Sequence, residues 1–153
     1  MVRIVDPPPG QRVDTGEAAY TVDDDKSTVW KTEGFNQPKF GNSKPGMGVL
    51  INLGSPRTVS DVRVETSVPG VGMDIRWGTS DPGDNGEGDA KVVKDFKRLS
   101  DGDIEKTDGT NENFIGFSED QKYQYILVWL SELPQDGDGR YRIEVSKIEV
   151  WGN

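Results

Sequence analysis

The sequence predicts an all-β protein, folded as a single sandwich or jelly roll. Three observations support this prediction. Apolar residues come in short runs rich in β-branched and aromatic side chains, 19 glycines and 9 prolines are spread between those runs, and few windows without them are long enough for a helix. The length of 153 residues matches one domain. Roughly seven or eight short strands separated by turn signals are typical of a sandwich.

Four expected strands lie in the first two thirds of the chain. Residues 49–53 form an apolar run that Gly54-Ser55-Pro56 closes, and residues 59–66 alternate with Val62 and Val64 on one face. Met73, Ile75 and Trp77 alternate with polar residues, and 91–99 repeats the pattern more weakly. These segments are expected as strands.

The last third contains three further expected strands. Residues 114–117 are short, whereas 123–130 is almost continuously apolar and is typical of a central strand. Residues 141–151 alternate, but the register changes near Ser146 and Lys147, which predicts a bulge or bend there. Its expected inward residues are Ile143, Val145, Ile148 and Val150.

Three loops interrupt this pattern. Residues 32–48 are rich in Gly, Pro and Asn and contain Phe35 and Phe40, residues 80–90 are acidic and glycine-rich, and residues 134–139 form a short acidic turn. Long loops in a compact domain are uncommon and are usually functional or disordered. The sequence therefore leaves these loops as either functional or disordered segments.

Composition excludes several function classes. A net charge of −9 argues against nucleic acid, because phosphate binding needs clustered Lys and Arg; it fits a cation, a neutral partner or simple solubility. With no Cys and no His, thiolate and imidazole zinc sites are excluded, as are Cys–His and Ser–His–Asp catalysis. A glycosidase with paired carboxylates is disfavoured, because 27 acidic residues offer such pairs by chance.

Two short motifs at opposite ends of the chain resemble one family. Residues 21–30 read TVDDDKSTVW and residues 146–152 read SKIEVWG. They resemble the first loop and last strand of discoidin-like, galactose-binding-like domains, and GVLINLG at 48–54 is similar to a strand of that family. Asp24 replaces the usual glycine of the first motif. The resemblance implies a jelly-roll β-sandwich.

The same resemblance implies a structural Ca²⁺ site that ties the first loop to the last strand. Hard oxygen ligands suit this ion. The alternative is that Asp23 and Thr28 only cap a turn. The implied ligands are the side chains of Asp23, Thr28 and Glu149 and the backbone oxygens of Tyr20, Asp25 and Ile148.

Aromatic and basic residues supply the candidate ligand-binding positions. Trp30 and Trp151 at motif positions, and Trp77 and Trp129 in strand patterns, are expected in the core. Phe35 and Phe40 lie in a polar loop, where they either stack on a sugar ring or fold under the loop; the sequence leaves both alternatives open. Lys44 and Arg76 are candidates for binding carboxylates on the peptide stems of peptidoglycan, on their charge alone.

A narrower resemblance suggests a cellular context. Residues 29–54, VWKTEGFNQPKFGNSKPGMGVLINLG, are similar to a discoidin-like subgroup in actinobacterial membrane proteins, the extracytoplasmic C-terminal domain of MurJ/MviN-type lipid II flippase proteins. This implies a stalk remnant with Pro7-Pro8-Pro9 and the first strand in 1–12, a domain in 13–153, and a location at the outer face of a membrane.

The function expected from these resemblances is non-catalytic binding of a carbohydrate of the cell wall. The alternative is a protein-interaction or structural domain of a membrane or receptor-kinase complex, with no small ligand. Analogy at the level of the fold supports both functions and does not distinguish between them.

Overall fold

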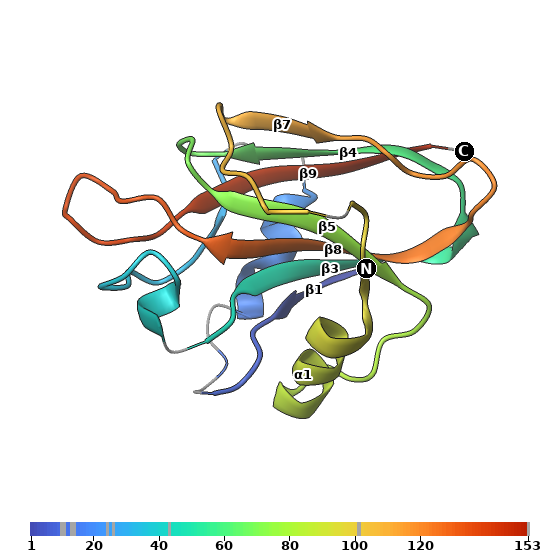
Figure 1. The fold of residues 1–153 in the computed structure, drawn as a ribbon, viewed down its shortest axis with the longest axis horizontal. Coiled ribbons are helices and arrows are strands. Elements are labelled where there is room, and N and C mark those ends of the chain that lie inside the picture. Colours follow the sequence, from blue (N-terminus) through green and yellow to red (C-terminus); the bar gives the residue numbers. More distant parts are fainter. Residues whose placement is uncertain are drawn as a thin grey trace.

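The computed structural model describes residues 1–9, 12, 15–23, 25, 27–42, 44–100 and 102–152. They form two antiparallel sheets packed face to face, so the expected all-β sandwich is confirmed (Figure 1). In spatial order, the five-stranded sheet contains β1 (Val2–Val5), β3 (Met47–Arg57), β8 (Tyr123–Glu132), β5 (Gly72–Gly78) and β6 (Lys97–Arg98). The four-stranded sheet contains β2 (Trp30–Lys31), β9 (Glu144–Gly152), β4 (Val59–Thr66) and β7 (Asn111–Phe114). Three helical segments accompany them: η1 (Thr15–Thr21), η2 (Phe40–Asn42) and α1 (Gly86–Asp95).

The main core lies between the two sheets and follows the period-2 pattern of the sequence. Val62 and Val64 of β4 are buried there, as are Val145 and Ile148 of β9. The expected bulge is present: Glu65 pairs with Lys147 but Thr66 pairs with Val145, so Ser146 is the extra residue. The bulge lets both halves of β9 keep their apolar side chains inward.

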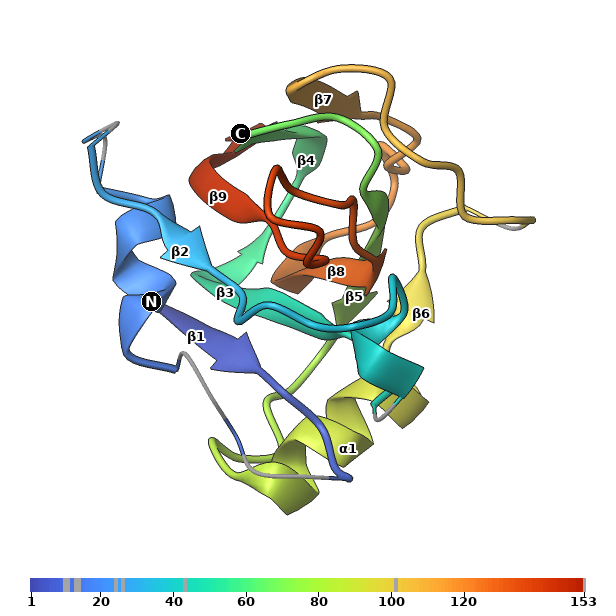
Figure 2. The same cartoon turned by 90° about the vertical axis from the view of Figure 1, so that its left-hand side faces the viewer.

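A second, smaller core explains why β8 is apolar on both faces. Residues 126, 128 and 130 face the four-stranded sheet, whereas Leu127 and Trp129 face the opposite way. Helix α1 covers that outer face with Val92 and Phe96 (Figure 2). Strand β8 is the middle strand of five, as its continuous apolar pattern predicts.

The expected strand over residues 91–99 is wrong for most of its length, because the helix α1 occupies residues 86–95. Its N-terminus is capped: the side chain of Asn85 accepts a hydrogen bond from the backbone N–H of Gly88 at 2.7 Å. Val92 and Phe96 are four residues apart, so a helical turn brings both onto the sheet. Only Lys97 and Arg98 of the expected segment form a strand, β6.

The N-terminal segment belongs to the folded body where the structure describes it. Asp89 of α1, fully buried, accepts hydrogen bonds from Arg3 Nη1 at 2.6 Å, Arg12 Nε at 2.8 Å and the backbone N–H of Asp6 at 2.9 Å. The expected first strand is therefore present as β1, while the division between 12 and 13 stays a prediction. None of the helices in the described part of the chain is long and apolar enough to cross a membrane.

Candidate functional site

Phe35 and Phe40 fold under their loop, which is one of the two alternatives left open by the sequence. Their ring centroids are 5.3 Å apart in an edge-to-face arrangement, and their exposed fractions are 9% and 0%. Both rings belong to the main core between the sheets. Neither presents a face on which a sugar could stack, so these residues support the loop and do not form its binding surface.

Lys44 and Arg76 are also held inside the molecule. Lys44 Nζ lies 2.7 Å from Asp6 Oδ1, and its side chain is only 5% exposed. Arg76 Nε lies 3.3 Å from Asp74 Oδ2, and its guanidinium lies over the ring of Trp129. Each cation already has a carboxylate partner of the same chain. The expectation that they bind the carboxylates of an external ligand is therefore not supported by their placement.

Three of the six implied calcium ligands meet in one turn. Thr28 Oγ1 donates to Asp23 Oδ2 at 2.6 Å and lies 2.9 Å from the backbone oxygen of Asp25, and the Asp25 N–H donates to Asp23 Oδ1 at 3.0 Å. The Asp25 carboxylate accepts from the hydroxyl and N–H of Ser27, which lowers its pKa. This set of oxygens fits the chemistry of Ca²⁺ but equally makes a self-contained turn. Asp24 lies outside the described residues.

The other three implied ligands lie along η1 and β9. Tyr20 is 41% exposed in η1, which packs against β9. Ile148 is buried and pairs with Val64 of β4. The Glu149 side chain faces a groove on the outer face of the four-stranded sheet, where it forms an ion pair with Lys147 Nζ at 3.8 Å. Among the described residues, no three acidic side chains converge closely enough to hold a metal ion.

The four tryptophans fall into two pairs. Trp30 and Trp129 are buried, as expected. The expectation for Trp151 is wrong: it is 46% exposed, and the guanidinium of Arg63 lies 4.7 Å from its ring centroid. Beyond the bulge at Ser146, odd-numbered residues of β9 face outward, which is why Trp151 leaves the core. Trp77, at the end of β5, is only half-buried.

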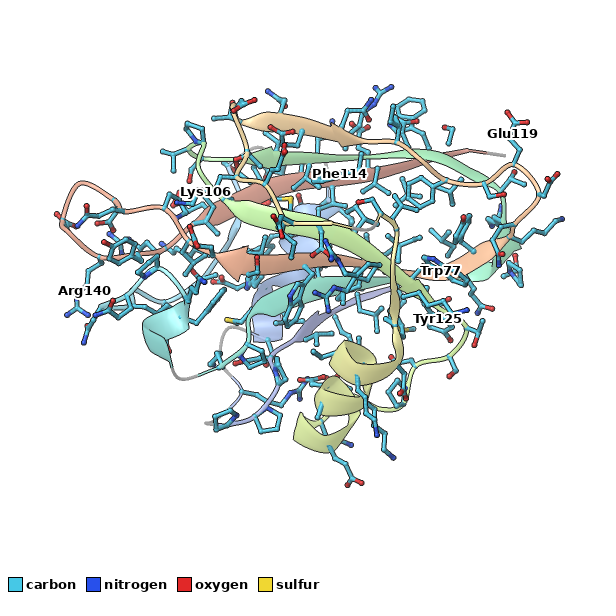
Figure 3. All side chains as sticks on the ribbon, in the orientation of Figure 1. Trp77, Lys106, Phe114, Glu119, Tyr125 and Arg140 are labelled. Atoms are coloured by element: carbon cyan, nitrogen blue, oxygen red, sulfur yellow. The ribbon has the colours of Figure 1, made fainter. Side chains whose placement is uncertain are left out.

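Trp77 forms part of a pocket of about 400 Å³ at the end of the five-stranded sheet. The end of β5, the C-terminal turn of α1, β6 and the segment before β8 meet there. Figure 3 shows Trp77 and Tyr125 near this end of the sandwich, with Arg140 at the opposite end. The pocket is lined by Trp77, Gly78, Thr79, Ser80, Pro82, Lys91, Asp95, Phe96, Lys97 and Gln121.

The aromatic wall of this pocket is rigidly supported. The ring of Tyr123 meets the indole of Trp77 edge-on, with centroids 5.2 Å apart, and Phe117 packs on Tyr123 in the same way. The Tyr123 hydroxyl accepts the N–H of Ser118 at 3.1 Å. A Cβ at Gly78 would lie 2.4 Å from the ring of Phe96, so only glycine lets that ring approach the strand.

A cavity at the opposite end of the sandwich has no aromatic residue among its described lining residues. This cavity of about 350 Å³ contains Asp136 and Arg142, which form an ion pair with each other. Burial acts to raise the pKa of Asp136, but the N–H groups of Asp138 and Arg140 and the nearby Arg142 lower it overall. In the Trp77 pocket, by contrast, Thr79, Ser80 and Gln121 offer hydroxyl and amide groups beside an indole.

The sequence contained a partial signal for the half-exposed tryptophans and for the pocket residues that were not among the predicted ligand-binding positions. Trp77 ends an alternating run directly before Gly78-Thr79-Ser80, which marks a strand end where an aromatic residue can meet solvent. The outward position of Trp151 follows from the bulge that the sequence did predict. Lys91, Asp95 and Lys97 could not be assigned to the pocket, because their segment was expected to be a strand and not a helix.

The fold is that of the carbohydrate-binding modules called CBM32, which have a galactose-binding-like β-sandwich. No family model matches the chain. Among solved structures, the CBM32 of AlyQ in complex with 4,5-unsaturated mannuronic acid is similar over 100% of this chain and 95% of its own, with a TM-score of 0.59 and 14% identity.

Two further structures show the same similarity. Chitosan-binding module 2 of a chitosanase/glucanase from Paenibacillus sp. IK-5, in complex with chitotriose, has a TM-score of 0.62 and 13% identity over 99% of this chain and 95% of its own. A pectin-binding carbohydrate-binding module has a TM-score of 0.58 and 14% identity over 98% and 88%. At these identities, the similarity establishes the fold alone.

Proposed function

We propose that this domain is a non-catalytic carbohydrate-binding module and that it binds sugar in the Trp77 pocket. The observation that supports this proposal most directly is the pairing of a half-buried, rigidly held indole with hydroxyl, amide and carboxylate groups in one cavity. Solved structures of the same fold include modules that bind mannuronic acid, pectin and chitotriose, which makes a glycan the natural ligand class.

The chemistry of the pocket suits a pyranose ring. One face of such a ring carries mainly C–H groups, which pack on an aromatic surface and remove apolar area from water. Its hydroxyls both donate and accept hydrogen bonds, as do Thr79, Ser80 and Gln121. Asp95 adds a carboxylate acceptor to the lining.

Binding to a panel of neutral and charged oligosaccharides, followed by calorimetry, tests the proposal. Trp77→Ala should abolish binding, whereas Trp151→Ala removes the other half-exposed indole and should leave it intact. Because Trp77 also supports Tyr123, Gln121→Ala provides a milder variant that should weaken binding without loss of thermal stability. Binding that survives both pocket variants, or no binding to any glycan, would refute the proposal.

The finer context is also a proposal, supported by the sequence resemblance of residues 29–54. In it, the domain lies at the outer face of the membrane as part of a MurJ/MviN-type flippase protein and binds a cell-wall glycan. Peptidoglycan fragments therefore belong in the panel. Affinity for these fragments that exceeds affinity for unrelated glycans would support this context, and a preference for other glycans would contradict it.

A protein-interaction domain is the second candidate function. The exposed Trp151, with Arg63 against its ring, favours it, because tryptophan and arginine are enriched at the centres of protein interfaces. The two functions predict opposite results for the same two variants. A protein partner recognised through the four-stranded sheet would be lost in Trp151→Ala and retained in Trp77→Ala.

A further inference from the structure

We infer that the Trp77 pocket selects sugars that carry an anionic group. This inference rests on the proposed function, because it assumes that the pocket binds a glycan. Its basis is the charge of the lining: two lysines, Lys91 and Lys97, and one acid, Asp95, give the pocket a local charge of +1, whereas the whole chain has a net charge of −9.

Lys97 is the cation best placed to meet a bound sugar. It lies on β6 directly opposite Trp77 on β5, and its Nζ is 5.3 Å from the centroid of the indole ring. Within the described part of the chain, Lys97 forms no ion pair, and its ammonium group lies over the indole of Trp77. An anion on a sugar stacked against Trp77 would therefore meet an ammonium group that forms no ion pair with any described carboxylate.

Lys91 supplies a second ammonium group from α1. Its ion pair is with Glu87, at 3.9 Å, and both side chains are more than half exposed. Exposed ion pairs of this kind contribute little to stability, so a ligand anion can replace Glu87 as the partner of Lys91. Lys91 and Asp95 are four residues apart, so they lie on one face of the helix, and both line the pocket. Asp95 can accept hydrogen bonds from sugar hydroxyls beside the two lysines.

Several other cations of the chain are paired with carboxylates. Four of them lie within 3.0 Å of a carboxylate of the same chain, so these ion pairs contribute to the folded structure. They are Arg3, Arg12, Lys44 and Arg98. A lysine ammonium binds carboxylate and sulfate alike, because it acts as a point charge. The chemistry that the pocket recognises is thus an anionic substituent on a pyranose, and either a uronic acid or a sulfated sugar provides it.

The test compares three ligands of equal length on the intact domain: an oligogalacturonate, its fully methyl-esterified neutral form and a sulfated oligosaccharide. The oligogalacturonate should bind about tenfold more tightly than its ester, since each exposed charge pair contributes up to about fivefold. Lys97→Gln should weaken uronate binding about threefold to fivefold and change ester binding less than twofold. Tighter binding of the sulfated ligand than of the uronate would assign the sulfate as the recognised group.

Lys94→Gln is the control, because Lys94 lies on α1 three residues before Lys97 but does not line the pocket. It should leave all three affinities unchanged. Equal affinity for the uronate, the ester and the sulfated sugar, or an equal effect of Lys94→Gln and Lys97→Gln, would overturn the inference while leaving glycan binding intact. If none of the three ligands binds, and no oligosaccharide of the neutral and charged panel binds either, the proposed function would instead be overturned.

Discussion

Removing the carboxylate of Asp89 should destabilise the domain strongly, because this one group joins the N-terminal segment to α1. It accepts three hydrogen bonds, from Arg3, Arg12 and the backbone of Asp6, at 2.6 to 2.9 Å. In Asp89→Ala all three donors lose their acceptor. Hydrogen bonds to a charged group contribute about 1.5–3 kcal/mol each, and breaking a buried ion pair costs about 3–5 kcal/mol.

The expected loss of unfolding free energy lies at the lower end of the range of about 3–5 kcal/mol for a broken buried ion pair. The side chains of Arg3 and Arg12 are 12% and 24% exposed, and each keeps a second carboxylate, Asp81 and Asp84 respectively. Water and these partners offset part of the loss, whereas the backbone N–H of Asp6 donates to Asp89 in a buried position. We therefore expect about 3 kcal/mol of lost unfolding free energy, or roughly 6–12 °C in melting temperature.

Urea denaturation monitored by circular dichroism measures this loss directly. The midpoint should fall with an unchanged slope, because the same surface is exposed on unfolding. Glu87→Ala is the control: it removes an acid from the same first turn of α1, but its side chain is 84% exposed, so the change should stay within about 0.5 kcal/mol. A loss below about 1 kcal/mol in Asp89→Ala would refute the role assigned to this carboxylate.

Three further predictions concern the helix cap, acid stability and calcium. Asn85→Ala should cost about 1 kcal/mol in the same denaturation assay, because α1 loses its N-cap; an unchanged midpoint would show that packing alone holds the helix. The hydrogen bond from Arg3 lowers the pKa of Asp81, so this pair stabilises the fold above the ordinary aspartate pKa and loses its effect as pH falls through the lowered value. Thermal melts over acidic pH should therefore show a shallower acid decline in Asp81→Asn, and an identical decline would contradict this. If the turn holds Ca²⁺, a thousandfold excess over its dissociation constant should add about 4 kcal/mol, a gain reversed by EDTA and absent in Asp23→Ala; melting unaffected by calcium would leave only a turn.

Local patterns explain which elements were predicted correctly. Alternation in β4 and β9 and the continuous apolar run in β8 reflect burial on one face or both, which side-chain order along a strand reports directly. The bulge at Ser146 was visible because a single extra residue shifts the period. The segment 91–99 was ambiguous, since Val92 and Phe96 suit a helical face while residues 93, 95, 97 and 99 suit a strand.

The positions of the charged side chains and of the aromatic residues in the loops could not be predicted from the order of residues along the chain alone. Lys44 and Asp6 are 38 positions apart and meet only because the loop before β3 folds beside the end of β1. Phe35 and Phe40 have no periodic partners in the sequence, so their burial depends on the space left between the sheets. Both cases changed candidate ligand-binding residues into structural ones.

The sequence by itself determined the class of fold, the central strand, the bulge and the exclusion of thiolate and imidazole chemistry, because periodicity and composition are properties of the chain. Only the tertiary structure decided which polar and aromatic groups remain available to a ligand. The Trp77 pocket combines a strand end, a helix and a loop separated by up to 44 positions, 77 to 121, and these meet through α1 packing on the outer face of the sheet. Long-range packing of this kind is not encoded in any local pattern, which is why the fold was predictable and this pocket was not.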